Sequence, residues 1–183
     1  MSANDRPAWR LETDVGAIEL VDVLEYEGAA PDGRHVEDFT AGYRPSSAHL
    51  LTLDGEPIAL FVGSGGATAV HPHSAVHVRG LLYVAVCDRV VCVRPKPYER
   101  RWTVVADPAT CFGVHYDAAQ DALISHGELQ IARLDDTGRI VWSASGADIF
   151  TGAFRLASDA VEATDFDGRI HRFDYADGSP LGH

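Results

Sequence analysis

Closely spaced histidines are the first candidates for chemistry in this chain. His71, His73 and His77 form an H-P-H-x3-H pattern directly after the glycine-rich run at residues 63–66. Neutral imidazoles at such spacing can bind zinc or iron, but zinc also requires a third or fourth ligand, and no HExxH spacing occurs in the chain. The sequence therefore names His71 and His73 as candidate metal ligands. The competing interpretation is that they are solvent-exposed loop residues.

A second set combines one histidine with four carboxylates. His126 and Glu128 lie in the segment SHGE, Asp148 lies in GADIFTG, and Asp165 and Asp167 lie in TDFDG. Each segment is an expected turn, and the turns of neighbouring small sheets can meet on one rim. A histidine among carboxylates can perform acid–base chemistry or hold a divalent metal. The alternative is that these side chains form and cap their own turns.

The elements that must position these residues are β-strands. Residues 121–142 show the pattern strand, tight turn, strand, tight turn, strand, and related patterns occur at 80–102 and 159–178. No segment has a sustained helical period. Trp102 precedes Trp142 by 40 residues. Further matching pairs are Gly127 and Gly168, Leu129 and Ile170, Asp135 and Asp174, and Gly138 and Gly178, which are 41, 41, 39 and 40 residues apart.

Units of about 40 residues with about four strands each are typical of propeller blades. With its glycines, Asp-x-x-Gly turns and tryptophans, the stretch 80–178 resembles the repeats of quinoprotein-type and WD-type β-propellers. It lacks the WD dipeptide and the Gly-His signature of WD repeats. The resemblance implies an all-β fold of antiparallel repeats, either propeller-like with about four small sheets or an open stack of sheets. It implies no activity, because a fold does not determine a function.

The organisation of the rest of the chain follows from its length and its turn residues. The 183 residues correspond to one domain. We expect a disordered arm at 1–7, a long loop at 29–47, and a hairpin at 48–64 with Asp54-Gly55 at its turn. The last unit lacks an outer strand. Either residues 9–11 supply that strand and close a ring, or the row of sheets stays open.

Charge and composition exclude several classes of function. The net charge of −12 argues against binding to nucleic acids or anionic membranes, and it suits a basic protein partner. The chain begins without the apolar core of a signal peptide, which favours a cytoplasmic location. Cys87, Cys92 and Cys111 lack metal-ligand spacing and are expected to be buried free thiols.

These observations lead to one main functional hypothesis. We expect a non-catalytic binding module without a cofactor, which docks a protein partner through a rim formed by His126, Glu128, Asp148, Asp165 and Asp167. The alternative is a small enzyme or metal-binding protein with a site on this rim or at His71 and His73. Homo-oligomerisation through an unpaired edge strand is a third hypothesis.

Overall fold

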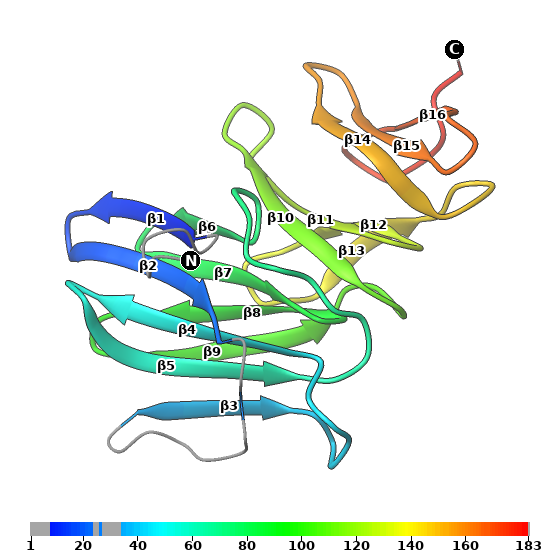
Figure 1. The fold of residues 1–183 in the computed structure, drawn as a ribbon. Helices are drawn as coiled ribbons and strands as arrows, with labels where there is room; N and C mark the ends of the chain where they lie inside the picture. The colour runs from blue at the N-terminus through cyan, green and yellow to red at the C-terminus, as the bar shows by residue number, and fades with distance from the viewer. Residues whose placement is uncertain (1–7, 24–25, 27–33, 183) are drawn as a thin grey trace.

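The computed structural model describes residues 8–23, 26 and 34–182, and this part of the chain is all β. Sixteen strands form four small sheets, which follow one another in an open row (Figure 1). The sheets are antiparallel except where β3 runs parallel to β5. The described residues contain no helix that is long and apolar enough to cross a membrane. The predicted arm at 1–7 lies outside the described residues.

The first two sheets contain the strands before residue 106. The first sheet has the order β1 (Ala8–Thr13), β2 (Gly16–Asp22), β4 (Ser47–Leu53), β5 (Glu56–Gly63) and β3 (His35–Phe39). The second sheet has the order β6 (Ala75–Val78), β7 (Leu81–Val86), β8 (Arg89–Arg94) and β9 (Glu99–Val105).

The last two sheets follow the chain without crossovers. The third sheet has the order β10 (Cys111–Asp117), β11 (Ala122–Gly127), β12 (Ile131–Leu134) and β13 (Ile140–Ala144). The fourth contains β14 (Phe150–Leu156), β15 (Val161–Asp165) and β16 (Ile170–Phe173). An isolated bridge joins Phe173 to Pro180 beside β16.

Two segments differ from what the sequence predicts. Residues 35–39, expected within a long loop at 29–47, form β3 instead, because Val36 packs on the apolar face of the first sheet and Tyr98 and Arg100 both bind Glu37. Residues 9–11 do not close a ring: they belong to β1, which pairs with β2. In the described part of the chain, no strand pair joins the first sheet to the fourth.

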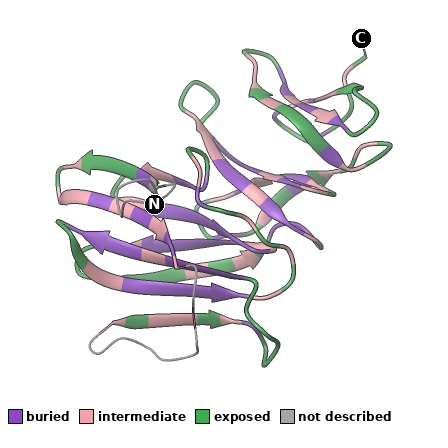
Figure 2. Cartoon of the chain, in the orientation of Figure 1, coloured by how far each residue is buried: buried purple, intermediate pink, exposed green. Residues whose placement is uncertain are grey.

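Apolar cores fill the three spaces between neighbouring sheets. Strands β7 and β8 are apolar on both faces, because each face meets a different sheet. Leu82, Val84 and Val91 face the first sheet, whereas Tyr83 and Val90 face the third. Figure 2 shows buried residues along β5 and β7 and exposed residues along much of β14.

Each conserved-looking spacing of 40 residues between tryptophans corresponds to the same contact between sheets. Trp102 donates from Nε1 to the carbonyl of Asp136 (2.9 Å), and its ring covers Gly138. Trp142 donates from Nε1 to the carbonyl of Tyr175 (2.9 Å), and its ring covers Gly178. Both glycines have positive φ angles, and a Cβ atom at either position would lie 2.6 Å from the tryptophan ring. A turn of one sheet thereby fastens the outer strand of the sheet before it.

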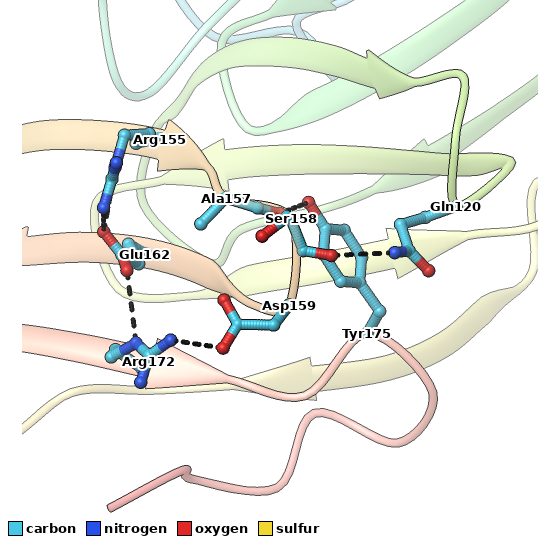
Figure 3. Close-up of polar contacts among 8 residues, drawn as sticks. All are labelled: Gln120, Arg155, Ala157, Ser158, Asp159, Glu162, Arg172 and Tyr175. Carbon is cyan, nitrogen blue, oxygen red and sulfur yellow. Dashed lines mark hydrogen bonds and ion pairs between the residues drawn. The ribbon is translucent and has the colours of Figure 1, made fainter. Parts of the chain in front are cut away.

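The far face of the fourth sheet carries charges instead of an apolar layer. Since Ala163 and Phe173 point toward the third sheet, the alternate positions Glu162 and Arg172 point away from it. Figure 3 shows the resulting ladder, in which Glu162 accepts from Arg155 (2.6 Å) and Arg172 (3.1 Å). Arg172 also donates to Asp159 (2.8 Å).

The opposite side of this sheet is fastened to the third sheet by polar contacts. The Tyr175 hydroxyl lies 2.9 Å from Asp117 and 3.0 Å from the Ala157 carbonyl, and Gln120 donates to the Ser158 carbonyl (3.0 Å; Figure 3). These bonds satisfy polar groups where the two sheets meet.

Candidate functional site

The turns at one edge of the four sheets form a continuous rim. Backbone hydrogen bonds join successive turns, so their relative positions are fixed. We define the rim as residues 40–46, 63–66, 87–88, 106–110, 127–130, 146–149 and 165–168. Its linking bonds run from Cys111 N to Cys87 O (2.6 Å), Glu128 N to Thr110 O (2.8 Å), Phe150 N to Glu128 O (2.7 Å) and Phe166 N to Ile149 O (2.8 Å).

A buried carboxylate that the sequence did not single out organises the centre of this rim. Asp107 accepts four backbone hydrogen bonds, from Ala109, Thr110, Leu129 and Gln130, at 2.7–2.9 Å. Gly127 leaves the space that this carboxylate occupies, since a Cβ atom there would overlap it. Both oxygens of Asp107 are therefore used to hold two turns together.

The predicted rim carboxylates lie in neighbouring turns but are engaged separately. Asp165 is buried and accepts from His171 Nε2 (2.7 Å) and from the backbone of Arg169 (2.8 Å). The His171 side chain lowers the pKa of Asp165, as does the Arg169 amide. Asp148 accepts from the Ile149 amide (2.7 Å), and Asp167 lies 3.9 Å from Arg169. Within the described residues, no side-chain hydrogen bond or ion pair joins two of these carboxylates, or joins one to His126.

His126 instead belongs to a cluster of aromatic rings where the third and fourth sheets meet. Its ring stacks on Phe154 of β14, with centroids 4.6 Å apart, and lies 5.5 Å from Phe112. His115 of β10 lies 4.3 Å from Phe154 and 6.4 Å from His126. The pairing of Gly113 with His126 places both histidines on the same face of the sheet. The structure thus brings His126 to His115, a residue that the sequence analysis missed because it stands alone in its strand.

The two predicted metal ligands lie at the edge of this cluster. The exposed ring of His73 lies 4.6 Å from His115 and 6.2 Å from His71. Both nitrogens of His71 have partners, because Nε2 lies 2.6 Å from the Phe112 carbonyl and Nδ1 lies 3.2 Å from the His73 amide. No group of three or more metal-ligating side chains in the described chain is arranged to hold a metal ion. Metal binding at His71 and His73 stays a prediction.

The electrostatics of the cluster favour neutral imidazoles. Burial, with help from the neighbouring histidines, lowers the pKa of His115 to about 3 and that of His126 to about 4. The Nε2 atoms of both rings are buried and have no hydrogen-bond partner among the described residues. These two atoms are the least satisfied polar groups near the rim.

A buried carboxylate–imidazole pair lies between the first two sheets and was also missed from the sequence. His49 Nδ1 lies 2.9 Å from one oxygen of Asp22, and the other oxygen accepts from the Val70 amide (2.9 Å). Burial lowers the pKa of His49, although Asp22 acts in the opposite direction. Because both oxygens of Asp22 are occupied, the pair fastens the segment before β6 to the first sheet.

Exposed apolar side chains gather on the same side of the molecule as the rim. Seven large hydrophobic residues are exposed in the described chain, and five of them lie in the rim or directly beside it. Tyr43 and Phe166 are the most exposed, at 75% and 70%. The five are Tyr43, Val105, Leu129, Phe166 and Ile170. Large exposed apolar side chains that cluster near carboxylates are typical of a docking surface.

The fold and this rim define a class of protein: an all-β, propeller-like chain whose sheets stand in an open row. None of the known family profiles matches the sequence. A comparison with curated proteins finds no similar sequence. The likeness to known proteins is therefore a likeness of structure.

Solved structures similar to this chain include BamB from Moraxella catarrhalis, with a TM-score of 0.54 and 12% identity. The match covers 94% of this chain and 59% of that one. A protein of unknown function from Bacteroides caccae matches with a TM-score of 0.44 and 13% identity, over 91% of this chain and 63% of that one. The chain thus spans less than two thirds of either structure. At such low identity, the similarity to BamB shows a propeller-like fold and nothing further.

Proposed function

We propose that this protein is a non-catalytic binding module whose rim docks a basic protein partner. The observation that carries the proposal is Phe166, which is 70% exposed on a turn that is hydrogen-bonded to the turn holding Asp148 and Ile149. A large aromatic side chain on a fixed backbone is a suitable anchor for a partner, because little conformational entropy is lost when it is covered.

The charge of the rim supports a basic partner. Glu128 and Asp148 flank the exposed Leu129 and Phe166, and neither carboxylate forms an ion pair within the described ranges. The net charge of −12 would attract a basic partner over a longer range and raise its association rate. Docking of this kind needs no cofactor.

The test begins with capture of binding proteins from the native host, followed by purification of the captured partner. We expect a basic protein whose affinity falls at least about tenfold in Phe166→Ala, the change typical of an interface anchor. Glu128→Gln and Asp148→Asn should slow association and reduce its dependence on salt.

Matched controls lie outside the rim. Val141→Ala removes an exposed apolar side chain from β13, and Glu56→Gln removes an exposed carboxylate at the opposite edge of the first sheet. Neither should change the affinity. A partner that binds equally well to Phe166→Ala and to the wild-type protein would contradict the proposal.

A further inference from the structure

A pocket on the outer face of the first sheet, remote from the rim, has the composition of a ligand site. Its volume is about 400 Å³, and its lining includes Arg10, Glu19, Thr52 and Asp54. Strand pairing sets Arg10 opposite Glu19 and Glu19 opposite Thr52, so the three side chains form a row across β1, β2 and β4. The pocket lies near the turn between β4 and β5, at the opposite ends of these strands from the rim.

The hydroxyl of Thr52 is unsatisfied in this row. Thr52 is only 7% exposed, and its Oγ1 has no hydrogen-bond partner in the part of the chain that the structure describes. A buried hydroxyl without a partner is unfavourable, and native proteins contain few of them. Because Thr52 lines the pocket, a ligand that enters it can supply the missing hydrogen bond.

The charges around Thr52 indicate what such a ligand must carry. Glu19 forms no ion pair or side-chain hydrogen bond within the described residues, although Arg10 stands directly across from it. Arg10 pairs instead with Glu12 (3.1 Å). Asp54 adds a second carboxylate, held at the pocket by the amide of Ala17 (2.8 Å). The unpaired charge in the pocket is therefore negative.

We propose that this pocket binds a small ligand through a primary ammonium group, which donates hydrogen bonds to the Glu19 carboxylate and to Thr52 Oγ1. Charge-assisted bonds of this kind are the strong ones. Asp54 contributes further negative potential, and Arg10 can accept an anionic end of the same ligand. This site is independent of docking at the rim.

The experiment follows backbone amide signals by NMR during titration with n-butylammonium. We expect saturable shifts at Thr52, Ala17 and Gly55. Tetramethylammonium has the same charge but no N–H donors, so it should cause no saturable shift at these residues. Equal responses to the two cations would overturn the proposal, because they would reflect charge alone. The absence of any saturable response to n-butylammonium would overturn it as well.

Two variants separate the predicted contacts. Thr52→Val keeps the β-branched shape and removes the hydroxyl, and Glu19→Gln removes the charge. Each should weaken the binding of n-butylammonium by about tenfold or more. Glu128→Gln, which tests the rim, should leave this binding unchanged, so the two proposals fail separately. Unaltered binding in both pocket variants would refute the assigned contacts.

The source of the ammonium group is distinguished by two further probes. Tighter binding of 4-aminobutyrate, with the gain lost in Arg10→Gln, supports the site and indicates a free zwitterionic ligand. Tighter binding of N-acetyl-lysine methylamide supports the site and indicates a lysine side chain of another protein. Binding of butyrate at the same residues would count against an ammonium site.

Discussion

Acid should destabilise this protein through His115 and His126, and the size of the effect can be worked out from their surroundings. Their pKa values of about 3 and about 4 lie below the ordinary value of 6.5, because burial disfavours the charged imidazole. The unfolded chain therefore binds more protons than the folded chain below about pH 6.5. The stability linked to these groups is present above that pH and is lost as the pH falls toward the folded values.

The magnitude follows from linkage. Near pH 5, both histidines are still neutral in the folded chain but are almost fully protonated in the unfolded chain. A drop of about 1.5 pH units below 6.5, at about 1.4 kcal/mol per unit, gives about 2 kcal/mol for each histidine. Together His115 and His126 should cost about 4 kcal/mol between pH 7 and pH 5, a large part of the about 5–15 kcal/mol that stabilises a typical domain.

The assay compares the wild-type protein with His115→Phe/His126→Phe, which retains the aromatic packing around Phe154. Urea unfolding, followed by tryptophan fluorescence at about pH 7 and about pH 5, gives the free energy of unfolding at each pH. We expect the double variant to lose about 4 kcal/mol less than the wild type across this range, and each single variant to account for about half of the difference. An identical loss in the wild type and the double variant would refute the reasoning.

Three further perturbations test other contacts by the same unfolding assay. Thr52→Val removes a buried hydroxyl without a partner and should raise the free energy of unfolding by about 1 kcal/mol; a decrease would show that the hydroxyl is satisfied. Gly138→Ala places a Cβ atom against Trp102 at a positive φ and should lower stability by about 2 kcal/mol, and a neutral result would argue against the close contact. Tyr175→Phe removes the hydroxyl that bonds to Asp117 and should cost about 1–2 kcal/mol, whereas an unchanged midpoint would contradict that bond.

Local patterns in the sequence predict much of the fold. The all-β class is confirmed, with four small sheets in a propeller-like arrangement. The hairpin at 48–64 forms as β4 and β5, because Asp54 and Gly55 both adopt the positive φ angles that a tight two-residue turn requires. The spacing from Trp102 to Trp142 also proves informative, since each ring covers a glycine in a turn of the next sheet.

The features that the sequence does not reveal depend on contacts between distant segments. β3 pairs in parallel with β5, and its short, mixed-polarity sequence gives no alternation from which a strand can be predicted. His115 is a single residue in a strand, and only the register of β10 against β11 places it beside His126. Asp107 resembles any turn-forming aspartate until the segment at 127–130 is folded against it.

The charged ladder on the far face of the fourth sheet has a consequence for self-association. An open row of sheets has two free faces, and a head-to-tail contact between such faces repeats from copy to copy without closure, which produces filaments. Burying Arg155, Glu162 and Arg172 against the first sheet of another copy would strip water from three charges, and desolvation of that kind opposes the contact. The ladder should therefore keep a propeller-like chain with open ends from polymerising, even at high concentration.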